Sequence, residues 1–118
     1  MKENTQVHYL EVVTPDVDGV CASYSQSLNV SFSDAMAEFG GARTVSLSNG
    51  GTLGIRTPMH DAEEPTTRPY YLVADIEKAV NEAEKSGAFV AVPPMEVSGR
   101  GKCAIIMFGL VQSGFWQV

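Results

Sequence analysis

One pattern of residues occurs twice in this sequence, 59 positions apart, which is half of the 118-residue chain. The clearer copy lies in the second half, where an apolar stretch, 70–73, is followed by Asp75 and an amphipathic segment. Its non-polar residues fall on one face of a helix with 3.6 residues per turn: Ile76, Ala79, Val80, Ala83 and Gly87. The positions 59 residues earlier are non-polar or aromatic too: Val17, Val20, Cys21, Tyr24 and Leu28. We therefore expect one domain, 1–118, made of two similar modules, 1–57 and 69–118, joined by a connector over 58–68.

Each module is predicted to run strand, helix, strand, strand, strand (βαβββ), which makes the fold class α+β. In the first module Asp16 is an expected helix N-cap, Asn29 an expected left-handed C-terminal residue, and Asn49-Gly50 a tight hairpin turn. Strands are expected over 7–13, 30–36, 43–47 and 52–56. In the second module a helix from Asp75 to about Ser86 lies among strands over 70–73, 89–92, 103–108 and 113–118, with a loop from Pro93 to Gly101. The alternative, a ferredoxin-like βαββαβ fold, leaves the last strands without a place.

Composition excludes several classes of partner. The net charge is -6 and the eight basic residues are scattered, so the sequence offers no basic stripe for nucleic acid. No apolar run approaches the roughly 20 residues needed to cross a bilayer, so we expect no membrane partner and a soluble, cytoplasmic protein. Cys21 and Cys103 are interpreted as small core residues rather than a disulfide.

The helix-opening segments carry a family resemblance. Two βαβββ units in about this length, opened by Thr14-Pro15-Asp16 and Val73-Ala74-Asp75, resemble the vicinal oxygen chelate superfamily, which includes glyoxalases, bleomycin-resistance proteins and extradiol dioxygenases. Val92-Pro93-Pro94-Met95-Glu96 and the closing Trp116-Gln117 are similar to its glyoxalase-like hydroxylase branch. The resemblance covers nearly the full chain. It implies a curled mixed sheet that forms a cup, with the helices on its outer face and a ligand inside.

The resemblance also bears on metals. Metal-using members carry a histidine on the first strand of each module, seven residues before the helix-opening acid, where this chain has Tyr9 and Arg68. A guanidinium has no free lone pair for coordination and a phenol must first lose its proton. We therefore expect a metal-free pocket and no cofactor. The alternative is a divalent metal held by His8, Glu11 and Gln117, which requires a slip or bulge in the first strand.

Several side chains are candidates for the pocket. Glu11 shares strand parity with Tyr9, and a buried carboxylate is costly unless it is paired. It is therefore either a polar anchor or general base, the weak catalytic candidate, or a structural partner of Arg56 or Arg68. The aromatic candidates Tyr9, Tyr70 and Trp116 either line the pocket or belong to the core. Arg100, between two glycines, either reaches an anionic ligand or lies in a solvated turn. The predicted ligand-binding set is Tyr9, Glu11, Arg56, Arg68, Tyr70, Arg100 and Trp116.

Three functions remain open at this point. The favoured one is a binding module that sequesters or senses a small aromatic or polar-aromatic molecule. The second is a metal-dependent lyase, isomerase or dioxygenase of the same superfamily, and the third is a pure interaction protein. A homodimer is expected, because modules of this kind expose sheet edges that a two-fold partner can cover.

Overall fold

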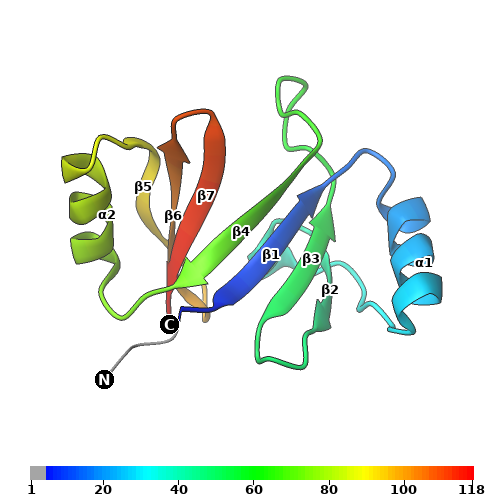
Figure 1. The fold of residues 1–118 in the computed structure, drawn as a ribbon. Coiled ribbons are helices and arrows are strands. Elements are labelled where there is room, and N and C mark those ends of the chain that lie inside the picture. Colours follow the sequence, from blue (N-terminus) through cyan, green and yellow to red (C-terminus); the bar gives the residue numbers. More distant parts are fainter. Residues whose placement is uncertain (1–4) are drawn as a thin grey trace. The chain divides into compact units, whose positions relative to one another are not determined.

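The computed structural model describes residues 5–118 and has the α+β architecture predicted from the sequence (Figure 1). Its elements in chain order are β1 (Val7–Val13), α1 (Val17–Leu28), the short 3-10 helix η1 (Ala37–Phe39), β2 (Arg43–Ser46), β3 (Thr52–Arg56), β4 (Thr66–Leu72), α2 (Ile76–Lys85), β5 (Phe89–Val97), β6 (Gly101–Phe108) and β7 (Val111–Gln117). The chain divides into two compact units. The N-terminal unit is Leu10–Thr67, and the C-terminal unit is Arg68–Val118 with the described residues that precede Leu10.

The repeat is visible in the positions of the elements. β1 begins at Val7 and β4 at Thr66, and the two long helices begin at Val17 and Ile76, so both pairs are 59 residues apart. The carboxylates of Asp16 and Asp75 accept backbone hydrogen bonds from the first turns of these helices, 3.1 Å each. Asn29 adopts the left-handed conformation that ends α1, with φ 56°. The predicted helix starts, and the end of α1 at Leu28, are confirmed.

The first module departs from the prediction at residues 30–36, which do not form a regular strand. The backbone N–H of Ser33 donates to the carbonyl of Thr44 (2.8 Å), but the returning bond comes from Thr44 N–H to the Ser33 hydroxyl (3.0 Å). A side-chain oxygen thus replaces the backbone carbonyl that a ladder would use. Only an isolated bridge between Met36 and Ala42 follows. The strand predicted over 30–36 is therefore wrong, because the serine side chain competes for the backbone donor.

In the N-terminal unit, β3 lies between β2 and the part of β1 that belongs to this unit. β2 and β3 are antiparallel, and Gly50 adopts φ 97° in the turn between them, as predicted for Asn49-Gly50. The core that joins these strands to α1 is built from Val12, Cys21, Leu53 and Ile55. Neither α1 nor α2 has the length and apolar character that a membrane crossing requires.

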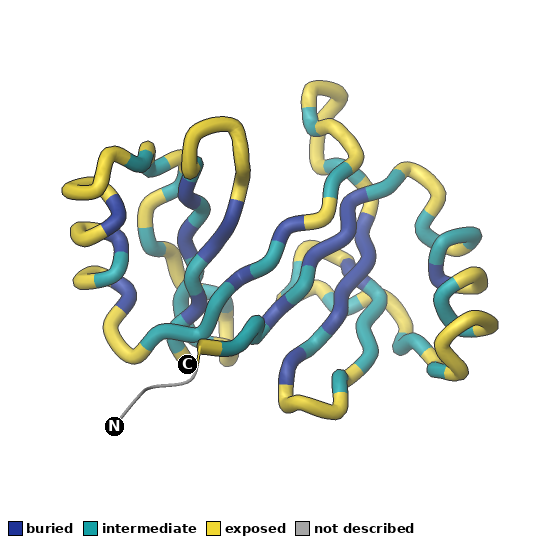
Figure 2. Tube along the Cα trace, viewed as in Figure 1, coloured by how far each residue is buried: buried dark blue, intermediate teal, exposed yellow. Residues whose placement is uncertain are grey.

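In the C-terminal unit the strands lie in the order β4-β7-β6-β5, with β4 and β7 parallel and the other pairs antiparallel. α2 buries Ile76, Val80 and Ala83 against Ala104 and Ile106 of β6. Figure 2 shows this pattern as dark blue segments along the helix and the strands, with exposed turns in yellow. The second module is βαβββ, as predicted.

The predicted loop from Pro93 to Gly101 is wrong for most of its length, because β5 continues to Val97. β5 ends the strand order of this unit, and its pairing with β6 shifts register between Val92 and Met95. Proline is tolerated at such a position, since neither an edge strand nor a bulge needs every N–H for its ladder. The turn is confined to residues 98–100.

Candidate ligand-binding sites

The strands of the C-terminal unit present a second face, opposite α2, which we call the distal face. Because side chains alternate along a strand, the neighbours of the α2-facing residues Ala104, Ile106 and Phe115 point to it. The strand register sets these neighbours side by side across β7, β6 and β5: Gln112 with Met107 and Phe89, Gly114 with Ile105 and Val92, and Trp116 with Cys103 and Met95. The middle of the distal face is thus apolar.

Three buried aromatic rings lie together at one side of the distal face. The ring centroid of Trp116 is 5.4 Å from that of Tyr9 and 5.6 Å from that of Tyr70, and the Tyr70 ring meets it edge-on. The indole N–H of Trp116 donates to the carbonyl of Arg100 at 2.9 Å. Tyr70 packs directly over Gly114, where a Cβ would run into the ring. This cluster brings together three of the predicted site residues, and it depends on the absence of a side chain at Gly114.

Arg68 lies two residues before Tyr70 in β4 and therefore on the same face. Its side chain is buried, with the residue only 4% exposed. Both its Nε and its Nη2 donate to the side-chain carbonyl oxygen of Gln112, at 2.9 and 2.6 Å. Gln112 itself is exposed. It was missed by the sequence analysis, because a polar residue near a turn gives no sign of a partner 44 positions away.

The N-terminal unit holds a second cluster of predicted residues, built on Arg56. Its Nε donates to Glu11 at 2.8 Å, while its two terminal nitrogens bind both oxygens of Glu63 at 2.9 and 2.8 Å. The hydrogen bonds that Arg56 donates to Glu63 raise the pKa of Arg56 strongly, burial opposes this rise, and the bond and charge of Glu11 add to it. Arg56 and Glu11 are 5% and 7% exposed. Of the two alternatives for Glu11, the structure shows an ion pair with Arg56.

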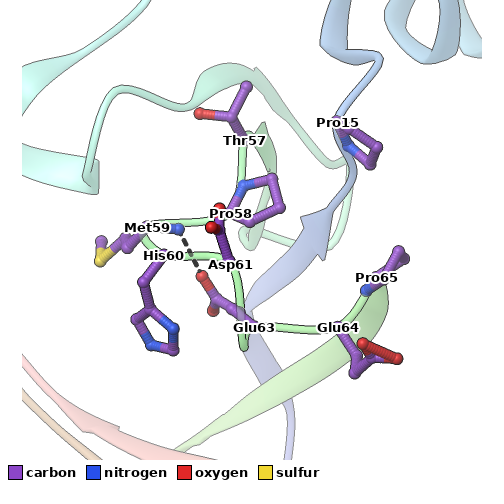
Figure 3. A pocket seen from close by; sticks show the side chains of 9 residues that line it. All are labelled: Pro15, Thr57, Pro58, Met59, His60, Asp61, Glu63, Glu64 and Pro65. Atoms are coloured by element: carbon purple, nitrogen blue, oxygen red, sulfur yellow. Dashed lines mark hydrogen bonds between the residues drawn. The ribbon is translucent and has the colours of Figure 1, made fainter.

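Glu63 also shapes a pocket of about 540 Å³ in the connector (Figure 3). Its carboxylate accepts the backbone N–H of Met59 at 2.7 Å, which closes the loop into a turn. The other residues that line the pocket are Pro15, Thr57, Pro58, His60, Asp61, Glu64 and Pro65. Most of these residues belong to the connector expected over 58–68, for which the sequence predicted no site. Since the Glu63 carboxylate is committed to Arg56 and Met59, we interpret the pocket as a consequence of loop packing.

The residues of the alternative metal site have other roles in the structure. The side-chain oxygen of Gln117 accepts the backbone N–H of Ile76 at 2.8 Å, at the start of α2. His8 is half-buried with its ring centroid 5.6 Å from that of Trp116, and burial lowers the pKa of its imidazole. Arg100 is exposed in the turn between β5 and β6. Among residues 5–118, no three His, Cys, Asp or Glu side chains come close enough together to hold a metal ion.

Solved structures with a similar fold include methylmalonyl-CoA epimerases, which are members of the vicinal oxygen chelate superfamily. The hypothetical protein BH1468 from Bacillus halodurans C-125 has a TM-score of 0.77 at 11% identity, over 98% of this chain and 96% of that chain. Methylmalonyl-CoA epimerase from Mycobacterium tuberculosis has a TM-score of 0.69 at 12% identity, over 93% and 85%. A methylmalonyl-CoA epimerase in complex with methylmalonyl-CoA and NH4+ has a TM-score of 0.69 at 13% identity, over 96% and 94%.

Sequence comparison identifies no relative of this chain. No family model matches the chain, and no curated protein matches it. At 11 to 13% identity the likeness to solved structures establishes the fold and not the chemistry. The glyoxalase-like branch therefore stays a prediction.

Proposed function

We propose that the protein binds a small aromatic or polar-aromatic molecule on the distal face of the C-terminal unit, without a metal. The observation that carries this proposal is the burial of Arg68 beside the cluster of Tyr9, Tyr70 and Trp116. A sheet face that served only as core would be filled with aliphatic side chains, because burying a guanidinium costs free energy that packing alone does not return. An apolar wall with a few fixed polar groups is instead the usual composition of a small-molecule site.

The part of the distal face next to these residues is partly accessible to solvent, and hence to a ligand. Ile105 and Met107 are half-buried, and Met95 is 52% exposed. Apolar surface that stays partly accessible next to a built polar group marks a binding surface more often than an isolated exposed residue does. The fold itself is compatible with the proposal, since one neighbour was solved with methylmalonyl-CoA bound.

The absence of a metal requirement is part of the proposal and rests on the donor set. Arg68 stands at a position where metal-using members of the superfamily carry a histidine, and its guanidinium cannot coordinate a cation. A positive charge there would also repel one. The ligand is therefore held by stacking, apolar contact and hydrogen bonds.

The experiment uses Trp116, which is the sole tryptophan of the chain and lies in the proposed site. Its emission is followed while the protein, kept in excess EDTA, is titrated with phenol, benzyl alcohol and phenylacetate. We expect saturable quenching or enhancement and a higher melting temperature with at least one probe. Tyr70→Leu should weaken binding roughly 2- to 10-fold, the value of one aromatic contact. Glu82→Gln on the exposed side of α2 is the matched control and should bind as the wild type does.

Two outcomes would reject the proposal. In one, none of the probes alters the emission or the melting temperature. In the other, binding occurs only after EDTA is replaced by a divalent metal, which would return the metal-dependent enzyme to first place.

A further inference from the structure

We propose that two copies of this chain associate through an apolar patch at the end of the C-terminal unit where β6 turns into β7. We call it the turn patch. It consists of four exposed side chains, Phe89, Phe108, Leu110 and Val111, with exposed fractions of 68%, 42%, 97% and 63%. Figure 2 shows the turn itself as an exposed segment. The proposal goes beyond the proposed function and does not depend on it.

The strand register gathers the turn patch from three strands. Phe108 of β6 lies across from Val111 of β7, and Leu110 lies in the two-residue turn between them. Phe89 of β5 lies across from Met107, the residue that precedes Phe108 in β6. All four side chains of the patch therefore lie at the same end of the strands.

The turn patch gathers exposed apolar surface in one place. Eight large hydrophobic side chains are exposed in residues 5–118, and four of them form this patch. Single exposed hydrophobic residues are normal on a protein surface, but a contiguous group of them marks an interaction surface. One member is also held in position, because the rings of Phe108 and Phe115 meet edge-on with their centroids 6.5 Å apart. A side chain that is already fixed loses less entropy when a partner covers it.

The fold does not require apolar residues at this turn. Gly109 supplies the left-handed conformation, with φ 65°, and Leu110 does not share it. Leu110 also belongs to neither hydrophobic core cluster. Glycine, asparagine, aspartate and serine are the usual residues of tight turns, and one of them would serve at this position. The exposed leucine is thus explained by what it contacts outside the chain.

Charge favours a second copy of the chain as the occupant of the turn patch. The sequence contains no Asp, Glu, Lys or Arg over 103–118. Residues 68–118 have five acidic and five basic side chains, a net charge of 0, whereas residues 10–67 have eight and two, a net charge of -6. The surface that matches an uncharged apolar patch is itself uncharged and apolar, and every copy of the chain presents one. An anionic lipid surface would instead repel a chain of net charge -6.

The size of the turn patch sets the strength of the association. Its four side chains expose roughly 400 to 500 Å² together, if a whole side chain of this kind presents about 150 to 200 Å². A stable interface buries about 800 Å² on each partner. The patch reaches about half of that value. We therefore expect a two-fold dimer in rapid exchange, with a dissociation constant of about 10 to 500 µM.

The test is sedimentation equilibrium of the full chain at concentrations from roughly 5 µM to 1 mM, which bracket the expected dissociation constant. The average mass should rise with concentration from the monomer's 12.7 kDa towards twice that value. Leu110→Gln and Phe89→Gln should each weaken the association about tenfold or more, because each change removes an apolar contact from both halves of a two-fold interface.

Leu28→Gln is the matched control. Leu28 is 56% exposed at the end of α1, in the N-terminal unit, so this variant should associate as the wild type does. None of the three substitutions removes a buried side chain, and equal melting temperatures would verify that all three variants fold.

Ionic strength gives a second readout. Two chains of net charge -6 repel each other, and the screening length decreases from about 30 Å at 10 mM salt to about 8 Å at 150 mM. Association through an uncharged patch should therefore be tighter at 150 mM. Tighter association at 10 mM would place charged groups across the interface and overturn the proposal.

Three other results would also overturn it. The first is a mass that stays at that of the monomer up to roughly 1 mM, or that rises beyond that of a dimer, since a two-fold contact closes with two copies. The second is equal weakening by Leu28→Gln and Leu110→Gln. The third is a chain that stays monomeric but sediments with neutral phosphatidylcholine vesicles and loses this binding in Leu110→Gln, which would assign the turn patch to a lipid surface.

Discussion

Replacing Arg56 by methionine should destabilise the protein by about 3 to 5 kcal/mol, which is the usual cost of removing one partner from a buried ion pair. Arg56 donates three hydrogen bonds to two carboxylates, and the side chains of Glu11 and Glu63 are only 9% and 15% exposed. Methionine fills much of the same volume but offers no donor. The loss is therefore a large share of the roughly 5 to 15 kcal/mol that stabilises a typical domain.

The assay is urea unfolding followed by far-ultraviolet circular dichroism, together with a thermal melt. In a domain of this size each 1 kcal/mol moves the melting temperature by about 4 °C, so the expected decrease is roughly 12 to 20 °C. The double variant Arg56→Met with Glu11→Gln should recover about 1 kcal/mol or more, because one of the two stranded charges is then removed.

The matched control is the surface pair of Arg43 and Asp18, joined at 3.1 Å with the Asp18 side chain 92% exposed. Asp18→Asn should cost less than about 1 kcal/mol, since water and salt screen such pairs. If Arg56→Met cost no more than this control, the buried cluster would contribute no more than a surface pair and the reasoning would be wrong.

Three further predictions concern single residues. Gly114→Ala should destabilise the protein by about 1 to 3 kcal/mol because its methyl group collides with the Tyr70 ring, and Tyr70→Leu in the same chain should make the loss less than additive in urea unfolding. Burial lowers the pKa of His8 below 6.5, so the unfolded chain takes up its proton first. The free energy of unfolding should then decrease as the pH falls through 6.5, and it should decrease less in His8→Gln than in the wild type. An equal pH dependence of the two proteins would contradict this. Burial raises the pKa of the Cys21 thiol, so a thiol reagent should label half-buried Cys103 first in the native protein, and equal rates would refute the placement of Cys21.

The sequence determined the repeat, the fold class and the helix boundaries, because these depend on local patterns. Helical spacing of apolar residues and the N-caps Asp16 and Asp75 act within a few residues of the chain, and so do Asn29 and Gly50, whose left-handed conformations end a helix and close a hairpin. Each of these predictions was confirmed. Local chemistry sufficed because every partner in them is near in sequence.

The tertiary structure decided where strands begin and end when pairing competes with side-chain hydrogen bonds. Residues 30–36 have strand-like alternation, but the Ser33 hydroxyl takes the bond from Thr44 N–H that a ladder would use. The two prolines 93–94 predict a break, yet β5 runs through them because it ends the strand order of its unit and its register shifts there. Neither outcome can be predicted from the sequence without knowing which strand lies beside the segment.

Side-chain partners distant in the sequence were likewise fixed only by the fold. Glu11 had two candidate partners, and its pairing with Arg56, 45 residues away, follows from strand neighbours rather than from spacing. Gln112 gave no sequence signal, although its side-chain oxygen accepts two hydrogen bonds from Arg68, 44 residues away. The identity of such residues sets what they can bind, but the strand register sets what they meet, and the register is a property of the folded chain.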